Sequence, residues 1–203
     1  MNFLAHIFLS GDDKEVLIGN FIADHVKGSQ SENFRPGIQK GIQLHRKIDL
    51  YTDSHPVVKN TKEVIRPAFG KYAPVVSDVY YDHFLAHNWH TVSDMPLEQY
   101  IQNFYEYAEQ VNEILPQRTR GMLSVMIRQN WLLSYRTIEG TGKILEAMSK
   151  RAAFESNMEM GGKVLREHYE TLEADFREFF PQLEQFVSDT IRRQAEKKIS
   201  RKV

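Results

Sequence analysis

Apolar side chains recur at every third or fourth position along most of the chain, which is the spacing of one face of an α-helix. We find no convincing run in which apolar and polar residues alternate strictly, as they do in a half-buried strand. The pattern therefore predicts an all-α fold of about eight to ten helices. The predicted helices cover residues 2–9, 14–27, 36–53, 57–69, 72–89, 97–114, 119–135, 138–150, 160–179 and 181–198.

Glycine and proline residues separate these predicted helices. Gly28 follows a lysine in a pattern typical of a helix C-terminus, and Pro56 is placed to begin a new helix. Pro116 and Pro181 are expected to end or kink the helices that precede them. Because no internal repeat or low-complexity linker interrupts the chain, we predict a single helical domain over residues 1–203.

The 203-residue chain contains no cysteine, 41% hydrophobic residues and 26% charged residues. These proportions are typical of globular proteins, and the missing thiols exclude disulfides, thiolate metal ligands and cysteine nucleophiles. No apolar stretch approaches the roughly 20 residues of a membrane-spanning helix, and the first residues lack the features of a signal peptide. We therefore expect a cytoplasmic protein without stable membrane insertion and without a nucleic-acid partner.

Although the net charge of the chain is only −1, its C-terminal end is strongly basic. From Arg192 onward the chain carries six lysine and arginine residues and a single acidic residue, Glu196. Such a segment can contact an acidic partner, or it can be the solvated end of a helix whose dipole it complements. The second interpretation is the simpler one, and the sequence leaves both open.

Histidine residues gather in the first ninety positions, which hold seven of the eight in the chain. In the predicted helix 36–53, His45, Asp49 and Asp53 follow one another at intervals of four and therefore share one face. One imidazole and one or two carboxylates a turn apart can hold a hard or borderline divalent cation. The alternative is a simple pair of His45 with Asp49 at a partly exposed position, with Asp53 at the helix end.

The segment VYYDHFLAHNWH, residues 79–90, combines aromatic side chains with one aspartate and three histidines. Asp78 and Asp82 lie one turn apart on a stripe that is otherwise apolar. Because the burial of an unpaired charge is very costly, such carboxylates should be paired, protonated or bound to metal. His83 adjoins Asp82 and lies deep in the apolar segment, so we expect it to join the same site.

Two further predicted helices bring polar groups to apolar faces. Asn20 and Asp24 share a face in the segment GNFIADHVKG, and His6 is a single imidazole in the segment MNFLAHIFL. A lone histidine in such a helix is more often a hydrogen-bonded core residue than a ligand. Four separate helices nevertheless carry histidine or aspartate on an otherwise apolar face, so we predict one shared metal centre.

Motifs of several other chemistries are missing from the sequence. It contains no G-x-S-x-G elbow, no G-x-x-x-x-G-K-[ST] loop and no H-E-x-x-H pair. The histidine and aspartate residues are therefore the strongest signal of chemistry in the chain.

At these residues the sequence resembles the acyl carrier protein phosphodiesterases, which remove 4′-phosphopantetheine from holo-acyl carrier protein. The resemblance rests on the segments MNFLAH, GNFIAD, GIQLHRKIDLYTD and DHFLAHNW, and extends more weakly through MSKR to the last helices. That family resembles a divergent branch of the all-helical HD phosphohydrolases, whose histidine and aspartate side chains hold a divalent ion. The resemblance thus implies an HD-domain-like fold and a bound Mn²⁺, with Mg²⁺, Fe²⁺ or Co²⁺ as alternatives.

HD proteins carry a His-Asp pair, whereas this chain has the reverse order at Asp24-His25 and at Asp82-His83. The ligands of that superfamily therefore cannot be transferred by position, and the site residues rest on the local patterns above. The predicted metal ligands are Asp24, His45, Asp49, Asp82, His83 and His6. The predicted catalytic carboxylates, one of which orients water or acts as a general base, are Asp24, Asp53 and Asp78.

Three functions follow, in order of preference. The first is metal-dependent hydrolysis of the phosphopantetheine–serine phosphodiester of holo-acyl carrier protein, which gives the apo-protein. The second is an HD-like phosphohydrolase acting on a small nucleotide or other phosphate ester, and the third is a non-catalytic helical interaction protein with a polar core. The first requires a basic docking surface for an acidic carrier, with candidates at Arg118, Arg120, Arg128, Lys150, Arg151 and the end from Arg192.

Overall fold

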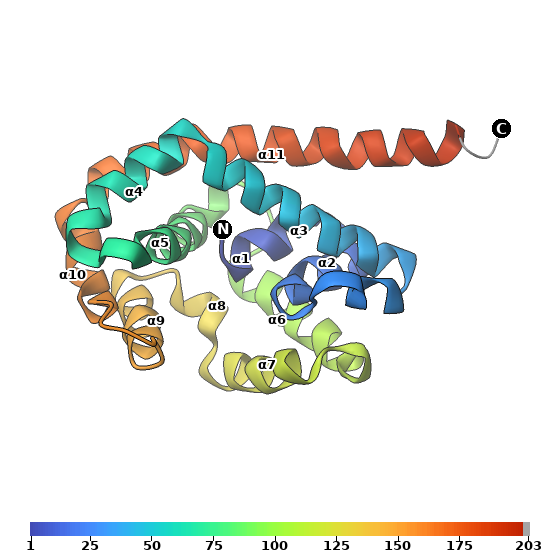
Figure 1. The fold of residues 1–203 in the computed structure, drawn as a ribbon, viewed down its shortest axis with the longest axis horizontal. Helices are drawn as coiled ribbons and strands as arrows, with labels where there is room; N and C mark the ends of the chain where they lie inside the picture. Colours follow the sequence, from blue (N-terminus) through green and yellow to red (C-terminus); the bar gives the residue numbers. More distant parts are fainter. Residues whose placement is uncertain (201–203) are drawn as a thin grey trace.

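The computed structural model describes the backbone of residues 1–200 and the side chains of residues 1–193. Over that range it contains eleven α-helices, linked by turns and short 3-10 helices, and no strand (Figure 1). The all-α prediction is confirmed. The helices are α1 (Phe3–Phe8), α2 (Lys14–Ile22), α3 (Pro36–Ser54), α4 (Pro56–Phe69), α5 (Ala73–His87), α6 (Leu97–Gln110), α7 (Gln117–Gln129), α8 (Trp131–Ser134), α9 (Ile138–Ser149), α10 (Gly161–Glu167) and α11 (Tyr169–Ser200).

Several helices end earlier than the hydrophobic pattern predicted, among them α6, which ends at Gln110 rather than at residue 114. α2 ends at Ile22, because the chain continues as a 3-10 helix, Ala23–His25, and becomes extended at Val26. The predicted helix 119–135 is divided into α7 and α8 by Asn130, whose φ of 48° and ψ of 54° are left-handed. Asparagine tolerates this conformation better than most residues, so it can end α7 in place of glycine.

Pro181 does not end a helix, contrary to our prediction. It lies inside α11, and the break in this region falls at His168 instead. Phe180 and Leu183, on either side of the proline, are buried in the core, so tertiary packing outweighs the poor helix propensity of proline. Figure 1 shows α11 along one edge of the molecule, where it packs against α3, α4 and α5.

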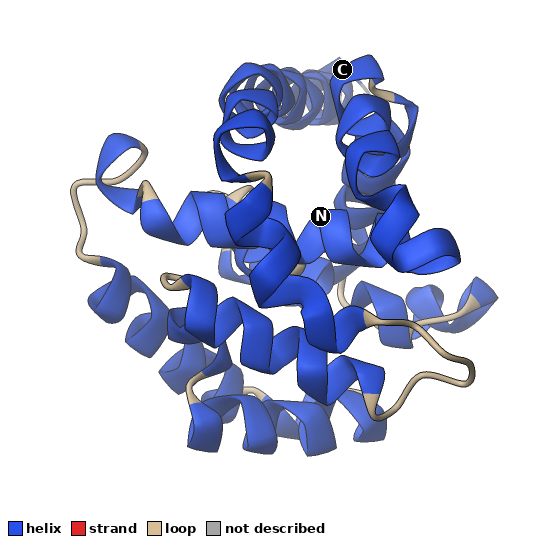
Figure 2. Cartoon of the chain, turned by 90° about the vertical axis from the view of Figure 1, so that its left-hand side faces the viewer, coloured by secondary structure: helices blue, strands red, loops and turns tan. Residues whose placement is uncertain are grey.

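α5 is a largely buried helix that lies between other helices. Every residue from Val79 to Ala86 is buried, including Asp82 and His83. The helix packs against α1, α4, α9 and α11, and Figure 2 shows a body made of helices joined by loops. The mixture of aromatic and polar side chains in this segment is therefore that of a core helix whose polar groups must find buried partners.

α2 and α3 lie so close together that side chains are excluded from part of their contact. A Cβ atom on either Gly19 or Gly41 would overlap the backbone of the facing helix. The two glycines therefore fix the register between these helices. This contact places Asn20 of α2 beside His45 of α3.

In the part of the chain that the structure describes, no helix combines the length and the apolar character needed to span a membrane.

Candidate metal centre

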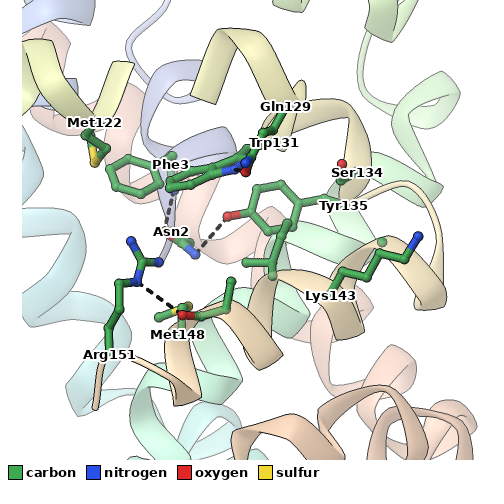
Figure 3. A pocket seen from close by; sticks show the side chains of 13 residues that line it. Asn2, Phe3, Met122, Gln129, Trp131, Ser134, Tyr135, Lys143, Met148 and Arg151 are labelled. Atoms are coloured by element: carbon green, nitrogen blue, oxygen red, sulfur yellow. Dashed lines mark hydrogen bonds between the residues drawn. The ribbon is translucent and has the colours of Figure 1, made fainter. Parts of the chain in front are cut away.

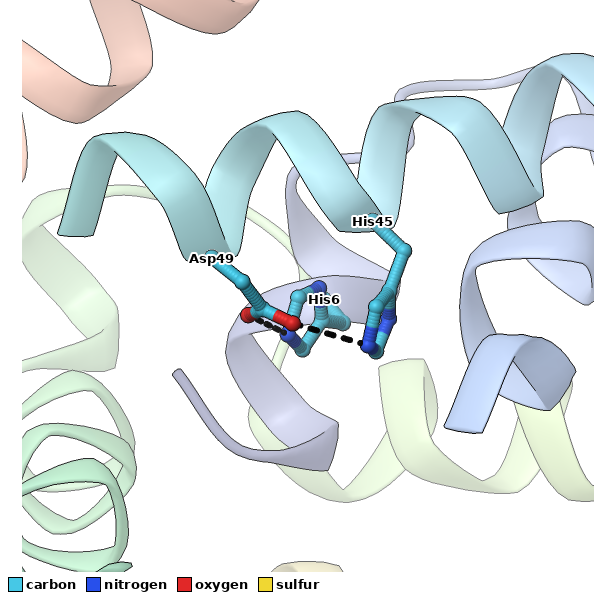
Figure 4. A group of neighbouring side chains, drawn as sticks. All are labelled: His6, His45 and Asp49. Carbon is cyan, nitrogen blue, oxygen red and sulfur yellow. Dashed lines mark hydrogen bonds and ion pairs between the residues drawn. The ribbon is translucent and has the colours of Figure 1, made fainter. Parts of the chain in front are cut away.

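His6, His45 and Asp49 come together where α1 meets α3 (Figure 4). His6 Nε2 lies 3.1 Å from Asp49 Oδ1, and His45 Nε2 lies 3.1 Å from Asp49 Oδ2. The two imidazole rings are stacked, with their centroids 3.9 Å apart. Both rings therefore direct a nitrogen at the same carboxylate, and we call these three residues the His6–His45–Asp49 cluster.

Asn20 fixes the orientation of the His45 ring. His45 Nδ1 donates to the Asn20 backbone carbonyl at 2.8 Å and lies 3.2 Å from the Asn20 side-chain oxygen. The Asn20 side chain is itself fixed, because its Nδ2 donates to the His6 carbonyl and to Ser10 Oγ. Since Nδ1 carries the proton of this bond, Nε2 of His45 is left to face the cluster, as in histidines that bind metal through Nε2.

Asp24 lies at the exposed edge of the cluster, in the 3-10 helix that follows α2. Its Oδ1 is 3.2 Å from His45 Nε2, and its side chain is 64% exposed. The hydrogen bond with His45 lowers the pKa of Asp24, so this group is a carboxylate at neutral pH. The cluster thus has a buried wall of two imidazoles and an open side that a substrate can reach.

The charges of the cluster are coupled. Burial opposes the protonation of His45, but hydrogen bonds with Asp24 and Asp49 outweigh it and raise the pKa of His45 to about 9. Burial also opposes the charge on Asp49, yet the hydrogen bonds from His45 and His6 hold the pKa of Asp49 well below its usual range. Burial lowers the pKa of His6 to about 4, so this ring is neutral at pH 7. Asp24 and Asp49 are ionised beside the imidazolium of His45, and the amino group of Met1, 3.7 Å from Asp49, adds a second positive charge.

These donor atoms fit a divalent metal ion. Two imidazole nitrogens and the carboxylates of Asp49 and Asp24 approach one another from three elements, and the two carboxylates would offset the charge of a bound divalent ion. Imidazole and carboxylate together are typical ligands of borderline ions such as Mn²⁺, Fe²⁺ and Co²⁺. The structure therefore brings together four of the predicted metal ligands, His6, Asp24, His45 and Asp49.

Asp82, another predicted metal ligand, instead anchors the short helix that carries His6. Its two oxygens accept the backbone N–H groups of Leu4 at 2.7 Å and Ala5 at 3.1 Å. The first N–H groups of a helix have no partner within it, so the buried start of α1 needs such an acceptor. Burial raises the pKa of Asp82 to about 7, against the effect of these two hydrogen bonds.

His83, which we predicted to join the same site, has partners of its own. Its Nδ1 donates to the Tyr135 carbonyl at 2.7 Å, and its Nε2 lies 3.3 Å from the Tyr169 hydroxyl. Burial lowers the pKa of His83 to about 4, so the ring is neutral at pH 7. The structure does not bring Asp82 and His83 to the His6–His45–Asp49 cluster, because both serve as buried hydrogen-bonding groups of α5.

The two remaining predicted carboxylates differ in their distance from the cluster. Asp78 Oδ1 lies 3.1 Å from the α-amino group of Met1, which is also 3.7 Å from Asp49 Oδ1. Asp78 therefore lies at the border of the cluster. Asp53 lies two turns beyond His45 on α3, and its exposed carboxylate pairs at 2.8 Å with Nζ of Lys62, whose side chain is largely buried.

Comparison with known proteins agrees with the resemblance seen in the sequence. The family model described as acyl carrier protein phosphodiesterase matches residues 1–183. The acyl carrier protein phosphodiesterase of Escherichia coli O6:H1 (strain CFT073) is 37% identical over 188 residues, which cover 90% of this chain and 95% of the relative. Proteins of the same name from Escherichia coli O139:H28 (strain E24377A) and strain K12 / DH10B are 35% identical over the same shares. No solved structure matches the chain. From the family model and these relatives together, the chain belongs to the acyl carrier protein phosphodiesterase family.

Proposed function

We propose that this protein hydrolyses the phosphodiester between 4′-phosphopantetheine and a serine of holo-acyl carrier protein, and that it needs a divalent metal ion to do so. Membership of the family makes the chain a hydrolase that acts on a phosphodiester. The observation that carries the metal requirement is the His6–His45–Asp49 cluster. Among the side chains that the structure describes, it is the one group of histidine, aspartate or glutamate whose ligand atoms converge.

Mn²⁺ is the ion we expect, with Mg²⁺, Fe²⁺ and Co²⁺ as alternatives. His6, His45 and Asp49 would hold it, with Asp24 as a further ligand at the exposed edge. The two imidazoles suit Mn²⁺ better than Mg²⁺, which prefers oxygen ligands. When bound, the ion would supply positive charge against the phosphate oxygens and would make a water molecule more acidic.

The chain's own residues would divide the remaining tasks. Asn20 keeps Nε2 of His45 turned toward the site. Asp24 is ionised and exposed, so its carboxylate can also accept the proton of the attacking water. Asp78, at the border of the cluster, is the next candidate for this general base. Asp53 is less suited, because its carboxylate is held by Lys62.

The likeness to HD phosphohydrolases is also part of our proposal. It is supported by the way in which α1, α3 and the 3-10 helix after α2 bring histidine and aspartate to one place. The ligand set itself is that of this chain and follows its own geometry.

An acidic carrier protein would need basic side chains to dock against. Arg120 and Arg128 of α7 line a groove on the surface, and Arg151 lies at the end of α9. Arg192 forms an ion pair with a neighbouring aspartate of α11. Arg193 is exposed, and the remaining basic residues of the C-terminal end lie beyond residue 193, outside the described side chains.

Intact-mass measurement of holo-acyl carrier protein tests the proposal. With enzyme and Mn²⁺ we expect the carrier to lose the mass of phosphopantetheine, and with enzyme and a chelator we expect no loss. His45→Ala should release far less phosphopantetheine than wild type. His90→Ala is the matched control and should act like wild type, because His90 is an exposed histidine outside the cluster. Release by thoroughly metal-stripped enzyme would refute the metal requirement, and no release with any of the four ions would refute the carrier substrate.

A further inference from the structure

A cavity lies between the start of α1, the end of α7, α8 and α9 (Figure 3). Its volume is about 380 Å³, within the usual range of small-molecule sites, about 300–1,000 Å³. Its walls are mainly apolar and come from Phe3, Met122, Trp131, Ile144 and Met148. The proposed hydrolysis of the phosphodiester does not require this cavity.

The polar groups around the cavity are neutral or cationic. Lys143 and Arg151 stand on opposite sides of it in Figure 3, and no aspartate or glutamate is among the described side chains that line it. Asn2 Nδ2 donates to the Tyr135 hydroxyl at 3.0 Å, which satisfies both groups, and the Arg151 guanidinium lies 5.8 Å from the centre of the Trp131 ring. The lining therefore disfavours cations and suits an apolar chain with carbonyl oxygens near Lys143 or Arg151.

The first residues of the chain link this cavity to the metal cluster. Asn2 and Phe3 line the cavity, whereas the amino group of Met1 lies 3.7 Å from Asp49 and His6 follows one turn along α1. From the dimensions of the backbone, the edge of the cavity lies on the order of 10 Å from Asp49. The phosphopantetheine arm has about as many chain atoms as four to five residues, and thus reaches roughly 15 Å when extended.

We propose that this cavity is the subsite for an acyl chain carried on the thiol of the prosthetic arm, and that Ala147 and Ile144 set the length of chain that fits. The inference rests on the proposed function, since it takes the phosphodiester end of the arm to lie at the cluster. With the phosphate there, the arm is long enough to bring its thioester to the edge of the cavity. The thioester and amide carbonyls then face the donors Lys143 and Arg151, and the acyl chain packs against the apolar walls.

The first experiment measures binding without catalysis. Metal-free protein is titrated with S-octanoyl-pantetheine by calorimetry, and Ala147→Phe is compared with wild type. Ala147 is an exposed wall residue of α9, so the larger side chain can narrow the cavity without overpacking the core. We expect at least tenfold weaker binding by Ala147→Phe, and no change in Ala174→Phe, an exposed position on α11 that serves as the control.

The second experiment measures kcat/KM on carrier protein in its thiol form and with acyl chains of increasing length. Ala147→Phe should lower the ratio of octanoyl to thiol turnover at least tenfold and leave the thiol form within twofold of wild type. Ile144→Ala should shift the preferred chain toward greater length, because it enlarges the cavity.

The outcomes separate this inference from the proposed function. If wild type cleaves the thiol form but both variants keep its chain-length profile, the acyl subsite is wrong and the proposed function stands. Failure of wild type to cleave either form defeats the proposed function, and the binding titration then decides on the cavity alone. Free octanoate binding as tightly as the pantetheine thioester would overturn the inference, because the cavity would then recognise a carboxylate.

Discussion

Two groups of histidine and aspartate in this protein consist of the same residue types and differ in how their polar atoms are used. At the His6–His45–Asp49 cluster, two ring nitrogens face one carboxylate, and one side is open to solvent. On α5, Asp82 and His83 are fully buried and bond to the backbone. In the first group the ligand atoms point toward a common place. In the second group the same kinds of atom already bond to backbone groups of the core. The bonds that a side chain already makes, rather than its type, therefore distinguish a candidate metal site from a polar core.

The largest effect should come from removing the ion or one of its ligands. Chelation, or His45→Ala, should lower turnover about a thousandfold, because metal-ion catalysis supplies several kcal/mol of stabilisation in the transition state. Steady-state rates before and after addition of Mn²⁺ measure the first effect. His45 is buried and bonded to Asn20, so thermal unfolding of His45→Ala is measured in parallel, and we expect the variant to stay folded at the assay temperature. If turnover of this variant falls only in step with its folded fraction, the cluster is a polar core and the comparison above fails.

Asp82→Ala should act mainly on stability. Two buried N–H groups lose their acceptor, and each costs about 1–3 kcal/mol, so we expect a loss of roughly 2–6 kcal/mol in the free energy of unfolding. Urea denaturation measures this quantity. Glu63→Ala is the control, because its exposed pair with Arg66 should contribute less than about 1 kcal/mol. A stable Asp82→Ala protein without activity would place Asp82 in the catalytic site after all.

His83 should make stability depend on pH. Its pKa is about 4 in the folded protein and near 6.5 in the unfolded chain, so only the unfolded chain binds the proton between these values. This contribution to stability is complete above about pH 6.5 and is lost as the pH falls toward 4, by roughly 3 kcal/mol in total. Between pH 7 and 4, wild type should therefore lose that much more stability than His83→Gln. Parallel pH profiles of the two proteins would contradict the buried neutral ring.

The smallest effect concerns the orientation of His45. Asn20→Ala removes the side-chain oxygen near His45 Nδ1 but leaves the backbone carbonyl that accepts the shorter bond. We therefore expect only about tenfold weaker Mn²⁺ binding, at the lower end of what partners of metal ligands contribute. Titration of activity with Mn²⁺ measures this affinity. Ser10→Ala is the control, because it removes hydrogen bonds to the Asn20 amide and the His6 carbonyl but leaves both oxygens near His45 Nδ1. Unchanged affinity would show that the backbone carbonyl suffices.

Local spacing was enough to predict the fold class and two of the three residues of the cluster. His45 and Asp49 are one turn apart on a helix, and the structure places them on one face as that spacing requires. Spacing could not predict that His6, from a separate helix, would stack on His45, because nothing in a local pattern gives the contact between helices. The coincidence of polar residues on several apolar faces was the available signal.

The roles of Asp82 and His83 could not be predicted in the same way. Periodicity gives the face on which a side chain lies, but not which backbone groups that face meets. The partner of Asp82 is the N–H of Leu4, and the partner of His83 is the carbonyl of Tyr135, both far away in the sequence. Pro181 is a similar case. α11 continues through it because of the packing around the proline, which its own helix propensity does not predict.

The close contact of α2 and α3 constrains how the sequence can vary by mutation. Gly19 and Gly41 are not among the proposed metal ligands. Any larger residue at either position would nevertheless push the two helices apart and separate Asn20 from His45. A compensating change would have to move a whole helix rather than one side chain. In a library of all single substitutions, these two positions should therefore tolerate as little variation as the metal ligands themselves, and a conservation profile alone would not tell the two kinds of constraint apart.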